Sequence, residues 1–331
     1  MARPLRLLVP RDGWERLGAR IGATGVPVEP VIFEPDGRYT IEGHAVPRDE
    51  AGFTAAWFSL DTFIRKQDEL FLAEMIAAPS LQWMQSARAG YDHPAFATLS
   101  AKGVRLSMSK GPAPAIGEYV IAAALDHFQR GPERRAAQAA ARWLPLPFRE
   151  IAGTRWLCVG YGEIGREVAR RARGLGAHVT GVRRSGGSDA DADVIVAPDA
   201  MDPAMADADV VVLSVPLTGD NDGAYGAAFF AGFRPGALFI NVGRGQLLDE
   251  DALKDALDRG TIGHAVLDVT RVEPLPAEGW QWQHPRLTLT AHTSGIGSGL
   301  LERTDRVLLE NLQRYVGGDG LLHEVDPGAF A

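Results

Sequence analysis

A glycine-rich loop in mid-chain has the spacing that binds phosphate groups. Gly160, Gly162 and Gly165 follow the apolar run 155–159 and precede the helix-like stretch 167–176. The first glycine permits a tight turn, the second lets a pyrophosphate approach the backbone, and the third lets the helix pack closely on the strand. The start of the helix presents free N–H groups and a partial positive charge to the phosphates. We therefore predict a dinucleotide-binding site here rather than an ordinary strand-to-helix turn.

The residues after the next strand-like run, 178–182, indicate which dinucleotide fits. NAD-preferring sites place an acidic residue there, where it accepts hydrogen bonds from the adenosine ribose. This chain has Arg183, Arg184 and Ser185 instead. A guanidinium can bind a 2′-phosphate bidentately and a serine hydroxyl adds a donor, whereas a carboxylate would repel that phosphate. We predict a preference for NADP(H) over NAD(H); the alternative is a solvated basic pair at the end of a strand.

The composition is typical of a folded protein with ordinary cores. The chain has 331 residues, of which 46% are hydrophobic and 23% are charged, and its formal net charge is -8. This length favours two domains, and the acidic balance argues against binding to nucleic acid or to an anionic membrane. The single cysteine, Cys158, excludes an intramolecular disulfide and a metal site built from cysteines. We see neither a signal peptide nor a membrane span in the sequence, so we expect a cytoplasmic protein.

From about Thr154 to Thr290, short apolar runs alternate with helix-like stretches. Seven runs are predicted strands: 155–160, 178–182, 193–197, 209–215, 237–242, 264–269 and 287–291. Continuous apolar runs between helices are typical of a parallel sheet that is covered on both faces. We therefore predict an α/β fold with a Rossmann-type, doubly wound parallel sheet over residues 102–292. A second, smaller α/β domain is predicted from both chain ends, residues 1–101 and 293–331.

Seven sequence blocks occur in an order that is typical of one enzyme family. They are LQWMQSARAGYDH (81–93), IGEYVIAAAL (116–125), FREIAGTRWLCVGYGEIG (148–165), VPLT (215–218), FINVGRGQLLDEDALKDAL (239–257), LDVTRVEPLP (267–276) and TAHTSG (290–295). Together they resemble the D-isomer-specific 2-hydroxyacid dehydrogenases, a family that includes glyoxylate and hydroxypyruvate reductases. The resemblance covers most of the chain from about Leu81 onward. It implies that the smaller domain is flavodoxin-like and that the substrate binds between the two domains.

The resemblance also implies a catalytic arginine, glutamate and histidine. Arg244, in NVGRG, would hold the substrate carboxylate and polarise its carbonyl, for which a planar guanidinium is suited. His292, in TAHTSG, would exchange a proton with the carbonyl oxygen. Glu273, in VEPLP, would favour the protonated form of that histidine. The alternatives are a strand-end surface charge, a structural histidine and an ordinary loop glutamate.

Further site positions carry over from the same family. The turn Ala87–Gly90 would bind the substrate carboxylate through backbone N–H groups, and Asp268 would contact the nicotinamide carboxamide. The predicted cofactor contacts are Gly160, Gly162, Glu163, Ile164, Gly165, Arg183, Arg184, Ser185, Val215, Pro216, Val242, Gly243, Arg244, Asp268 and His292. The predicted substrate contacts are Ala87, Arg88, Ala89, Gly90, Arg244 and His292. No metal is expected, because an arginine and a protonated histidine supply the positive field that a metal otherwise would.

These motifs favour a reductase of small 2-keto acids such as glyoxylate or hydroxypyruvate. A dinucleotide-sensing binding protein, similar to the corepressors that resemble this family, is the alternative, because the fold alone does not fix function. A methyltransferase would use the glycine loop but would leave Arg244, Glu273 and His292 without roles. Family members are commonly homodimers, so we expect a homodimer with residues 116–130 and 143–148 in its contact region. Thr270 stands where the family usually has an aromatic residue, which weakens any transfer of substrate identity.

Overall fold

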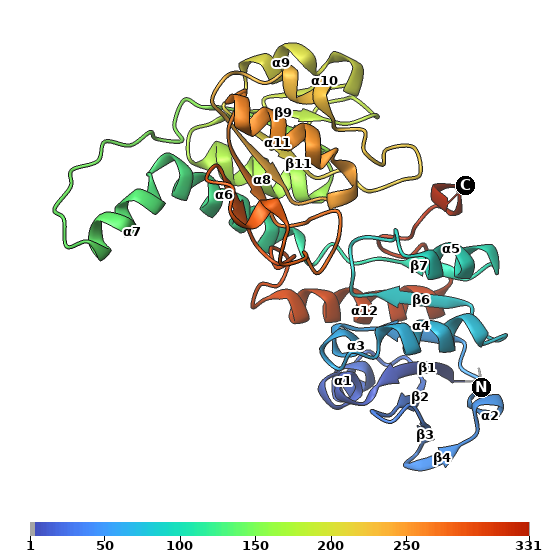
Figure 1. Ribbon diagram of the computed structural model, residues 1–331. Coiled ribbons are helices and arrows are strands. Elements are labelled where there is room, and N and C mark those ends of the chain that lie inside the picture. The colour runs from blue at the N-terminus through green and yellow to red at the C-terminus, as the bar shows by residue number, and fades with distance from the viewer. Residues whose placement is uncertain (1–3, 331) are drawn as a thin grey trace. The chain divides into compact units, whose positions relative to one another are not determined.

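The computed structural model describes residues 4–330, which form two compact units (Figure 1). Unit 1 contains the residues up to Pro112 together with those from Ser298 onward, and unit 2 contains Ala113–Gly297. Both junctions lie later in the chain than the expected boundaries at 101/102 and 292/293. Residues after 101 stay with unit 1 because β7 (Arg105–Ser107) pairs with β6 (Trp83–Ser86). Thr293 and Ser294 stay with unit 2 because their N–H groups donate to Asp268.

Unit 2 is built on a seven-stranded sheet with the order β10-β9-β8-β11-β12-β13-β14. Its strands are β8 (Arg155–Val159), β9 (His178–Val182), β10 (Val194–Val196), β11 (Val210–Leu213), β12 (Ala237–Asn241), β13 (Ile262–Leu267) and β14 (Leu287–Leu289). Every neighbouring pair is parallel. The order reverses between β8 and β11, as in doubly wound dinucleotide-binding folds. The predicted Rossmann-type sheet is confirmed.

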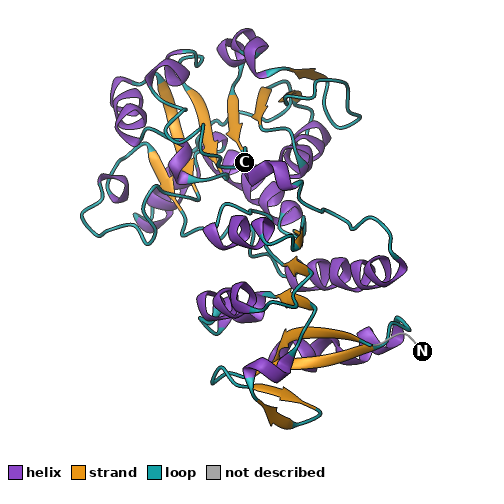
Figure 2. Cartoon of the chain, turned by 90° about the vertical axis from the view of Figure 1, so that its right-hand side faces the viewer, coloured by secondary structure: helices purple, strands orange, loops and turns teal. Residues whose placement is uncertain are grey.

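Helices cover both faces of this sheet (Figure 2). Because side chains alternate along a strand, Trp156 and Cys158 face one side and Leu157 and Val159 face the other. The first side packs against α6 (Ala113–Phe128) and α8 (Glu163–Gly174), and the second against α9 (Asp202–Asp207), α10 (Ala227–Ala231) and α11 (Glu250–Arg259). Burial on both faces explains why the strands are continuous apolar runs in the sequence.

Unit 1 contains a second sheet, which over residues 4–112 has the strand order β4-β3-β2-β1-β5-β6-β7. The strands besides β6 and β7 are β1 (Leu5–Pro10), β2 (Val28–Phe33), β3 (Tyr39–Ile41), β4 (His44–Val46) and β5 (Ala55–Phe58). The run β2-β1-β5-β6-β7 is parallel and has the flavodoxin-like order, while β3 and β4 extend one edge as antiparallel strands. The smaller flavodoxin-like α/β domain is confirmed as a fold.

The C-terminal helix explains why unit 1 needs both chain ends. The helices of this unit are α1 (Arg11–Ala23), α2 (Arg48–Ala51), α3 (Leu60–Ile64), α4 (Asp68–Ala77), α5 (Pro94–Ala101) and α12 (Leu300–Gly317). Leu308 and Leu312 of α12 are buried in one cluster with Trp83 of the sheet. Arg16 of α1 lies 2.8 Å from Asp61 of α3 and 2.8 Å from Asp305 of α12, so a largely buried charge network also joins the two ends.

An arm leaves the body of unit 2 after α6. It consists of α7 (Gly131–Ala139) and the extended segment that follows, and Figure 1 shows both projecting away from the sheet of this unit. Trp143 is 97% exposed, and Leu144 and Phe148 are also exposed. The arm returns to the body at Arg149, which lies 2.9 Å from Asp209. No helix within residues 4–330 is both long and apolar enough to cross a membrane.

Candidate active site

The glycine loop lies at the carboxyl end of β8 and is shaped by three different constraints. A Cβ at Gly160 (φ +94) would lie 2.7 Å from the backbone of Ser214 and Val215, and one at Gly165 would lie 2.6 Å from the Gly160 carbonyl oxygen. Both positions therefore require glycine. A Cβ at Gly162 would meet no described atom within 4 Å, so the space beside it is open. The first bond of α8 runs from Arg166 N to Gly162 O, so the N–H groups of Ile164 and Gly165 precede the first intrahelical donor and can bind an anion.

The basic residues after β9 differ in their surroundings. The Arg183 guanidinium donates to Gly186 O (2.6 Å) and Ser188 O (3.1 Å), and lies 3.8 Å from the Asp189 carboxylate. Its own loop therefore holds it. Arg184 and Ser185 are exposed, and within residues 4–330 the Arg184 side chain has no hydrogen bond or ion pair. Of the predicted pair, Arg184 is the guanidinium that can reach a phosphate without breaking a contact in this structure.

The loops after β12, β13 and β14 carry the three predicted catalytic residues. Arg244 follows β12, Glu273 follows β13, and His292 follows β14. The structure brings Glu273 and His292 together, with His292 Nδ1 2.8 Å from Glu273 Oε2. The carboxyl ends of parallel strands meet at one edge of a sheet, so residues far apart in sequence converge there.

The charges around Glu273 keep it ionised. Partial burial raises the pKa of Glu273, but the hydrogen bonds from His292 and from the Thr270 N–H, with the Arg244 charge, outweigh it and hold this pKa below its usual range. The Thr270 N–H donates to Glu273 Oε1 at 3.0 Å. Since a carboxylate only accepts, the proton between the pair is on His292 Nδ1. His292 Nε2 is then the ring atom that can exchange a proton with a ligand.

Asn241 and Gly245 hold the loop that carries Arg244 in place. The buried Asn241 donates through Nδ2 to Arg244 O (3.0 Å) and accepts from Gly243 N (3.0 Å). A Cβ at Gly245 would lie 1.9 Å from the Thr270 carbonyl carbon. Gly245 therefore lets the loop after β12 contact the loop after β13, and so places Arg244 near Glu273. Sequence reasoning missed Asn241, although a polar residue at the end of the apolar run FINV was the signal for it.

The remaining predicted cofactor positions lie at the same edge of the sheet. Val215 and Pro216 follow β11, and the Ser214 hydroxyl donates to Gly160 O at 2.9 Å, which joins the loops after β8 and β11. Val242 is buried. Asp268 is also buried, and its carboxylate accepts from Thr290, Thr293 and Ser294 of the loop that carries His292.

The predicted substrate turn lies in unit 1, after β6. The Ala87 N–H donates to Phe58 O (2.9 Å), and the Arg88 N–H donates to the Ser86 hydroxyl (3.0 Å). In the described part of the chain, the N–H groups of Ala89 and Gly90 have no acceptor. The Arg88 guanidinium lies over the Phe63 ring, 3.9 Å from its centroid. Ala89 and Gly90 are thus the two members of this turn whose N–H groups can bind a ligand.

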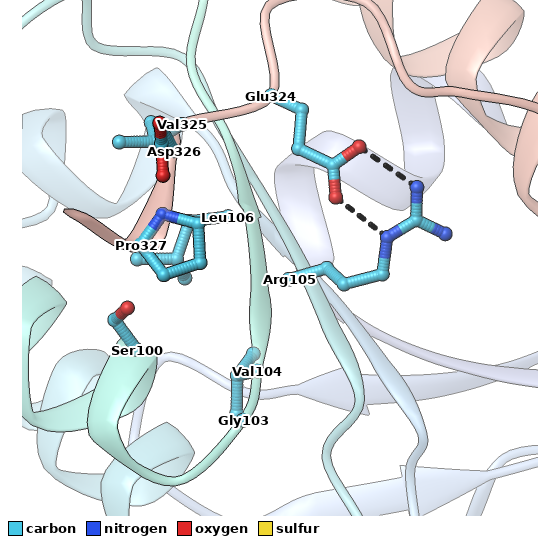
Figure 3. Close-up of a pocket in the computed structure, with 9 residues that line it drawn as sticks. All are labelled: Ser100, Gly103, Val104, Arg105, Leu106, Glu324, Val325, Asp326 and Pro327. Carbon is cyan, nitrogen blue, oxygen red and sulfur yellow. Dashed lines mark hydrogen bonds and ion pairs between the residues drawn. The ribbon is translucent and has the colours of Figure 1, made fainter. Parts of the chain in front are cut away.

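A cavity of about 340 Å³ in unit 1 contains none of the predicted site residues (Figure 3). It lies beside the ion pair of Arg105 with Glu324. The lining consists of Ser100, Gly103, Val104, Arg105, Leu106, Glu324, Val325, Asp326 and Pro327. Within residues 4–330, no group of three or more His, Cys, Asp or Glu residues is placed to hold a metal ion.

Replacing Gly245 by alanine tests whether the two loops must touch. The new Cβ would overlap the Thr270 carbonyl, so we expect Gly245→Ala to lower the free energy of unfolding by about 2 kcal/mol. Gly162→Ala is the matched control, because open space surrounds that position, and its free energy of unfolding should change by less than about 0.5 kcal/mol. Urea denaturation of both variants measures this difference. Equal free energies of unfolding for the two variants would show that the contact between the two loops does not require glycine at position 245.

Comparisons with known proteins identify the family to which the chain is similar. Residues 121–294 match the family model described as D-isomer specific 2-hydroxyacid dehydrogenase, NAD binding domain. D-3-phosphoglycerate dehydrogenase 3, chloroplastic, from Arabidopsis thaliana is 34% identical over 167 residues, 50% of this chain and 28% of that protein. Glyoxylate/hydroxypyruvate reductase A from Serratia proteamaculans (strain 568) is 30% identical over 186 residues, 56% of this chain and 59% of that protein. The chain thus spans less than two thirds of either curated relative.

A solved structure matches along the whole chain. The D-isomer specific 2-hydroxyacid dehydrogenase from Xanthobacter autotrophicus Py2, in complex with NADPH and MES, is 25% identical and aligns with a TM-score of 0.78. The alignment covers 100% of both chains. With the family model matching more than half of the residues, this chain belongs to the D-isomer specific 2-hydroxyacid dehydrogenase family.

Proposed function

We propose that this protein is a nicotinamide-dependent 2-hydroxyacid dehydrogenase that interconverts a small 2-keto acid and its 2-hydroxy acid. The observation that carries the proposal is the 2.8 Å hydrogen bond between His292 and Glu273, close to Arg244, at the edge of a dinucleotide-binding sheet. A relative named for glyoxylate and hydroxypyruvate supports a short side chain on the substrate. Fold alone would not carry the proposal, because binding proteins use the same architecture.

The protein residues divide the chemistry between them. The nicotinamide, when bound, supplies the hydride for reduction and accepts it for oxidation. His292 Nε2 donates a proton to the substrate carbonyl oxygen, while Nδ1 stays bonded to Glu273, whose carboxylate fixes the orientation of the ring. Arg244 binds the substrate carboxylate and polarises the carbonyl.

The glycine loop fits the pyrophosphate of a dinucleotide. Gly162 leaves open space at the start of α8, while Gly160 and Gly165 have no room for side chains. Glu163, Ile164 and Gly165 would present their N–H groups to the phosphates. For the adenosine half we propose that Arg184 and Ser185 select NADP(H), since the Arg183 guanidinium is held by Gly186 and Ser188. The NADPH in the Xanthobacter structure supports this preference.

Turnover measurements test the enzymatic proposal. We expect the purified protein to oxidise NADPH when glyoxylate or hydroxypyruvate is added. His292→Ala should lower kcat by about 100- to 10,000-fold, because it removes the proton donor. His292→Ala should bind NADPH with about the same affinity as His178→Ala. This control variant replaces an exposed histidine elsewhere in unit 2. Absorbance at the nicotinamide band follows the reaction, and fluorescence titration follows binding.

Two outcomes would contradict the enzymatic proposal. Undiminished turnover in His292→Ala would remove the histidine from the mechanism. Tight NADPH binding without turnover across a broad panel of 2-keto acids would favour the dinucleotide-sensing protein instead.

Cofactor preference is tested at Arg184. Loss of a charged hydrogen bond should make Arg184→Ala bind NADPH about 10-fold more weakly and leave NADH affinity unchanged. Arg259→Ala, which removes another exposed arginine of unit 2, is the control and should change neither affinity. Dissociation constants for both cofactors measure the effect. An equal loss for NADH and NADPH, or a wild-type preference for NADH, would exclude this assignment.

We propose that the protein is a homodimer and that the arm forms part of the interface. Trp143 is 97% exposed, and a cluster of exposed apolar side chains on one segment is typical of an interaction surface. A double variant, Trp143→Ser with Phe148→Ser, should shift the mass in solution from two chains to one, as measured by light scattering. A monomeric wild-type protein, or a variant that stays dimeric, would contradict this role of the arm.

A further inference from the structure

The turn that carries His292 has a backbone conformation that its surroundings must hold. His292 has φ +54, in the left-handed region that residues other than glycine rarely adopt. Such a conformation persists where neighbouring contacts over-determine it. Here the His292 N–H donates to Asp268 O (2.7 Å), and the Thr290 N–H donates to Leu267 O (3.0 Å). The backbone is therefore anchored on both sides of Ala291 to the end of β13.

The Asp268 side chain anchors the same turn from inside. It is 1% exposed, and its Oδ1 accepts from the Thr290 hydroxyl (2.6 Å) and from Thr293 N (2.9 Å). Its Oδ2 accepts from Ser294 N (3.0 Å). Within residues 4–330 no cationic side chain forms an ion pair with this carboxylate, so neutral donors from the turn compensate its burial. A buried carboxylate that loses a donor is strongly penalised, which gives each of these bonds a large effect on the turn.

Tyr119 extends this network to α6. Its hydroxyl lies 2.8 Å from Thr290 Oγ1. Thr290 has one hydroxyl proton, which it gives to Asp268, so Tyr119 must be the donor in the contact between the two hydroxyls. Burial raises the pKa of Tyr119 to about 12, which keeps this proton in place at neutral pH. The hydrogen bonds thus run in one direction, from Tyr119 through Thr290 to Asp268.

We propose that Tyr119 and Thr290 are positioning residues for His292, acting through the buried Asp268 carboxylate. The inference rests on the proposed function, because it concerns the proton-exchanging histidine of that site. The Tyr119 and Thr290 hydroxyl groups fix the turn 290–294. His292 Nδ1 therefore stays hydrogen-bonded to Glu273, and the ring holds Nε2 in a single orientation. Tyr119 itself forms no hydrogen bond with His292 or Glu273. Its effect is to hold the turn in the arrangement that places His292 Nδ1 on Glu273.

The test removes single hydroxyl groups. Tyr119→Phe keeps the ring and loses the donor, and should lower kcat about 5-fold, the worth of one neutral hydrogen bond, with KM for NADPH unchanged. Thr290→Val should lower kcat at least as much, and Thr290→Ser, which keeps the hydroxyl, should restore it.

The double variant Tyr119→Phe with Thr290→Val should have the same kcat as Thr290→Val alone, because both residues act through one chain of hydrogen bonds. Tyr315→Phe, which loses a hydroxyl bonded to Gln82 in unit 1, is the matched control.

A second readout does not need turnover. The nitrogen signals of the His292 ring, measured by NMR in the protein without ligands, should shift in Tyr119→Phe and Thr290→Val but not in Thr290→Ser or Tyr315→Phe. These shifts would support the positioning role even if the wild-type protein reduced no keto acid, which separates this inference from the proposed function. If Tyr119→Phe lowers only the melting temperature, with kcat and the His292 signals unchanged, the proposal is overturned. If Tyr119→Phe does not fold, Thr290→Val is compared with Thr290→Ser by the same two measurements. Equal kcat and equal His292 signals in these two variants would then overturn the proposal.

Discussion

The close contact between Gly245 and Thr270 is the constraint on which the arrangement of the candidate site depends. Because Gly245 has no side chain, the backbone after β12 reaches the backbone after β13. This contact places Arg244 near Glu273, and the Thr270 N–H orients the Glu273 carboxylate. The orientation of Glu273 then determines where the Nδ1 side of His292 must lie. A backbone packing requirement thus decides the geometry of three ionisable side chains.

Two carboxylates with different surroundings flank the histidine. Glu273 is partly exposed and bonds to the imidazole ring, whereas Asp268 is buried and bonds to the turn on either side of that ring. Glu273 therefore orients the ring of His292, and Asp268 fixes the turn that carries it. Arg244 adds a positive charge beside Glu273, so charged side chains of opposite sign lie next to each other in the site. Such a fixed arrangement needs little reorganisation when charge develops on a substrate.

Local sequence patterns predicted the fold well but the site only in part. The alternation of apolar runs and helices predicted the Rossmann sheet. The glycine spacing predicted the loop in which Gly160 and Gly165 have no room for a side chain and Gly162 leaves open space. The pairing of His292 with Glu273 came from the family resemblance, since a glutamate before proline in a loop carries no periodic signal. Tyr119 and Thr290 are separated by 171 residues, a contact that no local spacing indicates. Arg183 was assigned to phosphate, but carbonyls of its own loop hold its guanidinium.

Transfer of deuterium tests the central claim most directly. NADPH deuterated at the hydride position of its nicotinamide ring is incubated with the protein and glyoxylate, and the 2-hydroxy acid product is analysed by mass spectrometry. The account predicts one deuterium on the carbon that carried the keto group, and formation of this product about 100-fold or more slowly with His292→Ala. Oxidation of the cofactor without label in the hydroxy acid, or labelled product formed equally well by His292→Ala, would contradict it.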